Sequence, residues 1–124
     1  MRRGFVAGNW KMNLDRAGAI ALASAVGRGV ETNSVDVAIF PPAVYIDAAR
    51  TALGNSKVAL GAQNVSDQPN GALTGEISTS MLVDLGCRYV ILGHSERRHI
   101  LGETDAQVAA KTRAALAAGL TPIV

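Results

Sequence analysis

Short apolar runs bounded by glycine or proline recur along the chain and predict buried strands. The runs cover residues 5–7, 35–40, 58–60, 89–92 and 121–124. Runs of this length fit strands that are buried on both faces of a parallel sheet.

The segments between these runs have the apolar spacing of helices that bury one face. Helices are predicted over residues 14–28, 42–53, 80–85 and 104–119. Asn13 is a candidate N-cap for the first helix. The last helix has the clearest boundaries, because Thr104 and Gln107 form a capping box and Gly119 is a candidate C-cap.

A strand followed by a helix, repeated along the chain, indicates right-handed βαβ units and an α/β fold with a parallel sheet. Two arrangements satisfy this pattern: an open, doubly wound sheet or part of a closed eight-stranded barrel. The pattern alone favours the open sheet, because the chain has 124 residues and a full barrel takes about 250. No G-x-G-x-x-G follows the first strand, so a dinucleotide site has no support.

Composition and charge narrow the class of protein. The sequence is 48% hydrophobic and 18% charged, as in a folded globular domain. A net charge of +2 is too small to indicate a nucleic-acid or membrane partner. No apolar run reaches the roughly 20 residues of a membrane span, no signal-peptide core follows Met1, and the single Cys87 is expected to be a small buried residue. We therefore expect a cytoplasmic protein.

Polar residues cluster just after the predicted strands. They are Asn9, Lys11, Gln63, Asn64, His94, Ser95 and Glu96. Ligands of α/β proteins bind at the carboxyl ends of the strands, so these side chains are expected to converge on one small site.

Each candidate has a functional and a structural interpretation. Lys11 could hold a phosphate or developing negative charge, or it is a solvated surface lysine. His94 opens a short helical turn whose dipole disfavours imidazolium, so a neutral ring could polarise a carbonyl; otherwise it caps the turn or packs in the core. Glu96 is a possible general base, but an ion pair with Lys11, Arg97 or Arg98 is favoured.

Residues 68–75 form a predicted loop in which Leu73 and Thr74 lie between glycines. Such a loop could dock on another surface or be an ordinary flexible connection.

Four segments resemble signatures of the triosephosphate isomerase family. They are GNWKMN at residues 8–13, GAQN at 61–64, GALTGEIS at 71–78 and ILGHSERR at 91–98. They occur in the order and at the spacings of that family, and the resemblance runs over the whole chain. It overrides the open-sheet preference. It implies one N-terminal half-barrel domain over residues 1–124, with about four βα units of a (β/α)₈ barrel plus a fifth strand.

The resemblance also implies roles for the candidate residues. Lys11 contacts the substrate and offsets its negative charge, and Asn9 helps to orient both. His94 is the neutral electrophile that polarises the carbonyl. Glu96 and Ser95 are implied to contact these groups rather than the substrate itself. The implied reaction interconverts glyceraldehyde 3-phosphate and dihydroxyacetone phosphate, without a metal or an organic cofactor.

Thr74 and Glu76 lie in the segment that resembles the interface loop of the family. The family forms dimers through this loop, so the resemblance implies a higher oligomer in which Thr74 reaches toward Asn9 and Lys11 of a neighbouring barrel.

The catalytic glutamate, the closing lid and the phosphate-binding loops of the family lie in its second half. We therefore expect this chain alone to be nearly inactive and to need a complementary C-terminal half-barrel chain. The alternative is a non-catalytic half-barrel that self-associates through its open edges.

Overall fold

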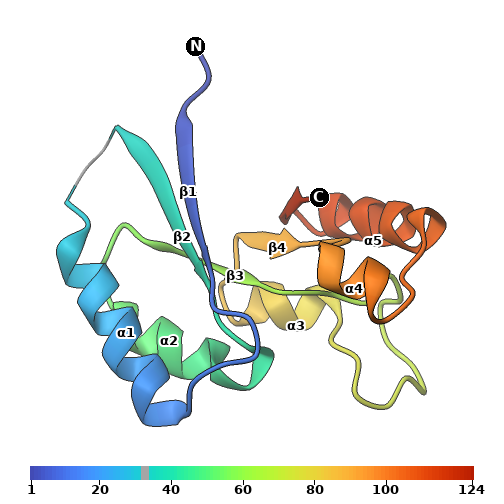
Figure 1. Ribbon diagram of the computed structural model, residues 1–124, viewed down its shortest axis with the longest axis horizontal. Coiled ribbons are helices and arrows are strands. Elements are labelled where there is room, and N and C mark those ends of the chain that lie inside the picture. The colour runs from blue at the N-terminus through green and yellow to red at the C-terminus, as the bar shows by residue number, and fades with distance from the viewer. Residues whose placement is uncertain (32–33) are drawn as a thin grey trace. The chain divides into compact units, whose positions relative to one another are not determined.

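The computed structural model describes residues 1–31 and 34–124 (Figure 1). The chain forms two compact units, Met1–Gln63 and Asn64–Val124, each of which is described by itself.

The first unit alternates strands and helices around a parallel sheet. Its elements in chain order are β1 (Gly4–Asn9), α1 (Arg16–Gly29), β2 (Val35–Phe40), the 3₁₀ turn η1 (Ala43–Tyr45), α2 (Ile46–Leu53) and β3 (Ala59–Ala62). β1 pairs with β2 in parallel from Gly4 opposite Val35 to Asn9 opposite Phe40. β2 pairs with β3 in parallel, and α1 packs on α2.

The second unit has the same alternation. After a loop come α3 (Thr79–Asp84), β4 (Tyr89–Ile91), α4 (Ser95–His99), α5 (Asp105–Ala117) and β5 (Thr121–Ile123). β4 and β5 pair in parallel, with Tyr89 opposite Thr121 and Ile91 opposite Ile123. The predicted order of strands and helices, and their parallel pairing within each unit, are therefore confirmed.

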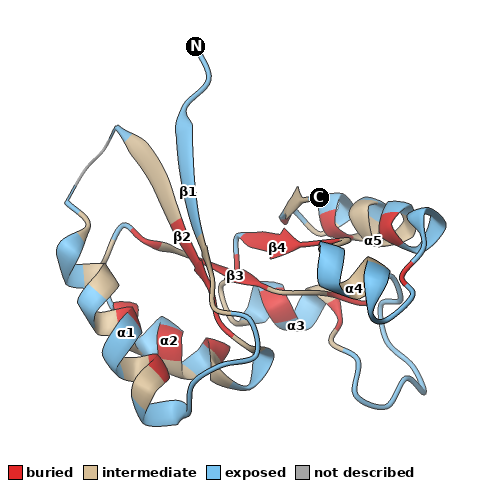
Figure 2. Cartoon of the chain, in the orientation of Figure 1, coloured by how far each residue is buried: buried red, intermediate tan, exposed pale blue. Residues whose placement is uncertain are grey.

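Small residues allow close packing in the first unit. Ala19 and Ala23 of α1 and Ala49 of α2 are fully buried (Figure 2). Gly61 in β3 has no substitute, because an added Cβ would lie 2.3 Å from the Phe40 ring. In the second unit Cys87 is buried, as expected.

Strand β1 departs from the expectation of strands buried on both faces. Its side chains Phe5 and Val6 are 39% and 57% exposed, and β1 is largely pale blue in Figure 2. By contrast, all three residues of β4 are buried.

The ends of two helices test the predicted caps. The helix predicted from residue 14 begins at Arg16, and Asp15 rather than Asn13 is its N-cap, accepting from the Gly18 N–H. Leu14 has a φ of +76°, which a helix excludes. The capping box of Thr104 and Gln107 is confirmed.

At the other end of α5 the C-cap is Ala118 rather than Gly119. Gly119 follows it with a φ of +81°, the left-handed conformation that ends many helices. Among the described residues, no helix has the length and apolar character needed to cross a membrane.

Candidate active site

A tight turn over residues 9–13, named here the lysine turn, follows β1. The Asn9 side-chain oxygen accepts a hydrogen bond from the Lys11 N–H at 2.9 Å. The Asn13 amide donates to the Trp10 carbonyl at 2.9 Å, and the Trp10 N–H donates to the Phe40 carbonyl of β2 at 3.1 Å. The turn is therefore closed by its own side chains and tied to the neighbouring strand.

The backbone of Lys11 is in the left-handed region, with a φ of +55°. This conformation is unfavourable for a residue with a Cβ, so neighbouring groups must hold it. Gln63, directly after β3, provides that restraint: its amide donates to the Lys11 and Phe40 carbonyls, both at 2.8 Å. The lysine side chain itself is exposed.

The second cluster, residues 93–98, is named here the histidine turn and follows β4. Gly93 has a φ of +61°, and His94 is the N-cap of α4. The His94 Nδ1 accepts a hydrogen bond from the Glu96 N–H at 3.2 Å. Because Nδ1 is the acceptor, the proton of the neutral ring is on Nε2. The ring is 29% exposed and can present Nε2–H as a donor.

The Glu96 carboxylate lies 3.3 Å from the same Nδ1 atom. This contact is an ion pair only if Nδ1 carries a proton, and the backbone N–H already uses that lone pair. The backbone contact is set by the start of α4, whereas the Glu96 side chain is 46% exposed. We therefore describe His94 with a neutral ring, in which Nδ1 accepts from the first turn of α4 and Nε2 carries the proton.

Arg97 and Arg98, two of the three candidate ion-pair partners of Glu96, contact other carboxylates. Arg97 contacts Glu103 at 2.9 Å, and Arg98 contacts Asp105 at 2.5 Å. Both carboxylates lie beyond the end of α4, so the chain must fold back before they are within reach.

Glu103 is a buried carboxylate held by two cations. Its Oε2 accepts from Arg97 Nε at 2.9 Å and from Lys111 Nζ at 2.7 Å, and its side chain is only 4% exposed. Burial raises the pKa of Glu103, but the hydrogen bonds and charges of Lys111 and Arg97 outweigh it, so the pKa lies below its ordinary value. Lys111 also donates to Asn64 at 3.0 Å.

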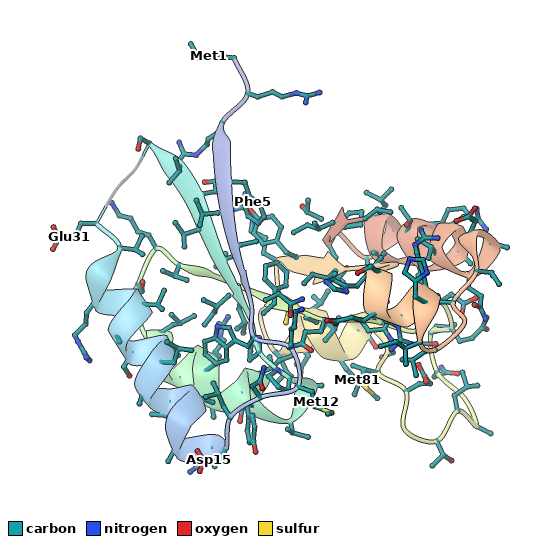
Figure 3. The ribbon with its side chains drawn as sticks, viewed as in Figure 1. Met1, Phe5, Met12, Asp15, Glu31 and Met81 are labelled. Atoms are coloured by element: carbon teal, nitrogen blue, oxygen red, sulfur yellow. The ribbon has the colours of Figure 1, made fainter. Side chains whose placement is uncertain are left out.

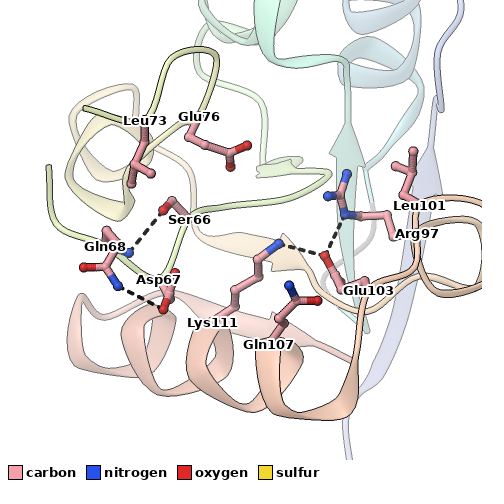
Figure 4. A pocket seen from close by; sticks show the side chains of 10 residues that line it. All are labelled: Ser66, Asp67, Gln68, Leu73, Glu76, Arg97, Leu101, Glu103, Gln107 and Lys111. Atoms are coloured by element: carbon pink, nitrogen blue, oxygen red, sulfur yellow. Dashed lines mark hydrogen bonds and ion pairs between the residues drawn. The ribbon is translucent and has the colours of Figure 1, made fainter. Parts of the chain in front are cut away.

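A pocket of about 330 Å³ lies beside this cluster. Its lining residues are Ser66, Asp67, Gln68, Leu73, Glu76, Arg97, Leu101, Glu103, Gln107 and Lys111. Figure 4 shows Lys111 and Arg97 converging on Glu103. The other oxygen of Glu103, Oε1, is buried and has no hydrogen-bond partner among the described residues. Arg97 is the one residue of the histidine turn in this lining, and His94 is not part of it.

The loop that carries Thr74 and Glu76 is exposed over residues 67–76. A hydrogen bond of 2.8 Å from the Ser66 N–H to the Ile77 carbonyl closes its base. Leu73, near its middle, is 43% exposed. The loop therefore presents apolar surface from a fixed base.

The predicted site residues fall into groups by unit. Met12, which follows Lys11 in the lysine turn, is 94% exposed and is labelled in Figure 3. Asn9 and Lys11 contact each other in the first unit. His94 and Glu96 contact each other in the second, where Ser95 is the exposed first residue of α4.

Three supporting roles were missed by sequence reasoning. Gln63 was noted only as a polar residue after a strand, and its grip on Lys11 spans 52 positions. Neither Glu103 nor the contact of Arg98 with the Gly93 carbonyl has a local motif that marks it. Within residues 1–31 and 34–124 no group of three or more acidic, histidine or cysteine side chains is arranged to hold a metal ion.

Parallel strands alternating with helices, and polar groups directly after the strand ends, define an α/β protein of the class that binds ligands at the carboxyl ends of its strands. The profile of the triosephosphate isomerase family matches residues 4–124. The chain therefore belongs to the triosephosphate isomerase family.

Individual relatives agree with this assignment. A triosephosphate isomerase of Hydrogenovibrio crunogenus is 52% identical over 126 residues, covering 100% of this chain and 50% of the relative. That of Thiobacillus denitrificans is 52% identical over 124 residues, covering 100% of this chain and 49% of the relative. That of Rhodopirellula baltica is 50% identical over 124 residues, covering 99% and 49%.

The chain spans about half the length of the curated relatives it matches. Together with the order of strands and helices, this confirms the prediction of half a (β/α)₈ barrel.

Proposed function

We propose that this chain supplies the electrophilic part of a triosephosphate isomerase active site. The reaction interconverts glyceraldehyde 3-phosphate and dihydroxyacetone phosphate, a step of glycolysis and gluconeogenesis, in the cytoplasm. The relatives are named for this activity, and this chain matches about half of each. The remaining residues complete the barrel, either in the same polypeptide or in a complementary C-terminal half-barrel chain.

The observation that carries the proposal is the state of His94. Its Nδ1 accepts from the Glu96 N–H, so the neutral ring donates from Nε2. A donor aimed at a carbonyl oxygen stabilises the negative charge that develops there when the neighbouring carbon loses a proton. A neutral histidine at a helix N-terminus is the established arrangement in this family.

Lys11 and Asn9 supply the second contribution. The lysine turn holds Lys11 in a strained backbone conformation and leaves its side chain exposed. A positive ammonium group there offsets the charge of a triose phosphate and of the enediolate. Asn9 fixes the Lys11 peptide through a hydrogen bond of 2.9 Å and thereby orients the turn.

The proton acceptor comes from the part of the family that this chain does not match. The resemblance places the catalytic glutamate there, together with the lid and the phosphate-binding loops. General base catalysis contributes about 10²–10⁴-fold, so the residues matched here are nearly inactive by themselves.

Two surfaces support the proposed partners. Phe5 and Val6 of β1 expose apolar side chains that a completed barrel would cover. The loop around Thr74 and Glu76 exposes Leu73, which fits an oligomer contact with a neighbouring barrel. Native mass spectrometry distinguishes a complementary half from the alternative, a non-catalytic half-barrel that associates only with copies of itself.

A joined isomerase tests the proposal: this chain continued after Val124 by the C-terminal half of the Hydrogenovibrio crunogenus relative. We expect triose phosphate turnover in a coupled assay. His94→Gln should lower kcat by on the order of 10²-fold or more, because the carbonyl loses its donor. His99→Gln, an exposed histidine at the end of α4, is the matched control and should leave kcat unchanged. A joined isomerase without turnover, or one unaffected by His94→Gln, would contradict the proposal.

A further inference from the structure

Arg98 holds the backbone on both sides of His94. Its side-chain Nε donates to the Gly93 carbonyl at 2.8 Å. Its own N–H donates to the His94 carbonyl at 3.1 Å. The Arg97 N–H also donates to the His94 carbonyl, at 2.9 Å. The contact that depends on the arginine side chain is therefore the one with the Gly93 carbonyl.

The far side of the Arg98 guanidinium is anchored at the start of α5. Its Nη1 contacts the Asp105 carboxylate at 2.5 Å. Asp105 is the first residue of α5, directly after the Thr104 N-cap, whose capping box fixes this end of the helix. The guanidinium thus spans from a rigid helix end to the peptide before His94, a planar fork geometry that a lysine ammonium cannot reproduce.

The peptide that Arg98 contacts lies in a closely packed turn. Gly93 has a φ of +61°, and a Cβ added there would lie 2.8 Å from Val108 and 2.9 Å from the Arg98 guanidinium. Because a peptide unit is planar, the direction of the Gly93 carbonyl also fixes the direction of the His94 N–H. The His94 ring then starts from a defined backbone position.

We infer that Arg98 is a positioning residue that sets the direction of the His94 ring, and hence of Nε2–H, for carbonyl polarisation. This inference rests on the proposed function. Arg98 acts only through His94 and the peptide before it. Its loss should lower the rate of the chemical step more than substrate binding, because misplacing a reacting group by about 1 Å can cost on the order of 10²-fold.

The first test compares Arg98→Ala with Arg113→Ala in the joined isomerase. Arg113 is an exposed arginine of α5 that makes no ion pair among the residues that the structure describes. We expect Arg98→Ala to lower kcat by about tenfold or more with little change in KM. Free guanidinium should restore part of this loss by filling the vacated position. Arg113→Ala should match the unaltered joined isomerase.

The second test reads His94 directly by imidazole ¹⁵N NMR, with only this half of the joined isomerase labelled. The labelled half has two histidines, so His99 is an internal control. The unaltered protein should show distinct Nδ1 and Nε2 shifts for His94, which move toward each other in Arg98→Ala. Asp105→Asn leaves the Gly93 contact in place and should lower kcat only about threefold, the size of an exposed ion pair.

These outcomes separate the two proposals. Full kcat and unaltered His94 shifts in folded Arg98→Ala would overturn the positioning role while the isomerase proposal stands. If Arg98→Ala fails to fold, Arg98→Lys decides, because a lysine ammonium cannot hold both the Gly93 carbonyl and Asp105. Lower kcat with shifted His94 signals in Arg98→Lys supports the role, and unaltered kcat and signals overturn it. A joined isomerase without turnover contradicts the proposed function, and the NMR comparison still tests whether Arg98 orients the ring.

Discussion

The lysine turn and the histidine turn present their functional groups by opposite means. In the lysine turn, uncharged amides of Asn9 and Gln63 hold a strained backbone, and the side chain of Lys11 remains exposed. In the histidine turn, a charged guanidinium grips the backbone and the helix end fixes the ring of His94 itself. The long side chain of Lys11 needs only a fixed backbone position, whereas the short side chain of His94 also needs a fixed ring orientation.

This difference indicates which changes of pH or packing should disturb each turn. Amide and backbone hydrogen bonds do not titrate, so the lysine turn should tolerate changes of pH. The histidine turn depends on close packing at Gly93, and its Arg97 pairs with the buried carboxylate Glu103. It should therefore respond both to small steric changes and to acid.

The largest expected effect comes from Gly93→Ala. An added methyl group would overlap Val108 and the Arg98 guanidinium. Overpacking costs about 1–3 kcal/mol, and a left-handed backbone adds about 1 kcal/mol for a residue with a Cβ. We expect the joined isomerase to lose about 3 kcal/mol of unfolding free energy in urea titrations.

Gly102→Ala separates the two contributions to that loss. Gly102 also has a left-handed φ, +71°, but no atom lies within 4 Å of an added Cβ. This variant should lose only about 1 kcal/mol. Equal losses in the two variants would show that packing at Gly93 is not the restraint we describe.

The next effect is on acid stability and concerns Glu103. Because its pKa is lowered by folding, its contribution is complete above the ordinary value of 4.5 and is lost as the pH falls through the folded pKa. Glu103→Gln should cost about 2 kcal/mol at neutral pH through weakened hydrogen bonds to charged partners. It should also flatten the loss of stability in acid.

Urea midpoints measured above and below pH 4.5 check this prediction. Asp47→Asn, an exposed acidic residue of the first turn of α2, is the control and should keep the acid dependence of the unaltered protein. If stability falls as steeply with decreasing pH in Glu103→Gln as in the control, the lowered pKa of Glu103 is contradicted.

The smallest expected effect is a gain in stability from a substitution in the first unit, next to the lysine turn. Leu14 has a φ of +76° and is 46% exposed. Leu14→Gly removes a backbone strain of about 1–2 kcal/mol from the folded protein. It also lowers stability by about 0.5–1 kcal/mol, because glycine makes the unfolded chain more flexible. We expect a net stabilisation of about 0.5 kcal/mol.

The same substitution within α1 should have the opposite sign. Leu22→Gly, at a partly exposed helix position, should lose about 1 kcal/mol. Thermal unfolding of both variants measures the contrast, and a loss of stability in Leu14→Gly would show that the left-handed Leu14 is not strained.

The sequence by itself determined the features that depend on near neighbours. The capping box of Thr104 and Gln107 spans three positions, and the strands appear as apolar runs because burial selects residue type directly. His94 at a helix N-terminus was predicted for the same reason: a glycine, a cap and a helical turn are adjacent in the chain.

Only the tertiary structure decided which distant groups support those features. Gln63 reaches Lys11 across 52 positions, and Lys111 reaches Asn64 across 47. The left-handed Leu14, which places the N-cap of α1 at Asp15 rather than Asn13, also depends on how the chain leaves the lysine turn. Side-chain hydrogen bonds carry no periodicity along the chain, so their partners are fixed only when packing brings separate elements together.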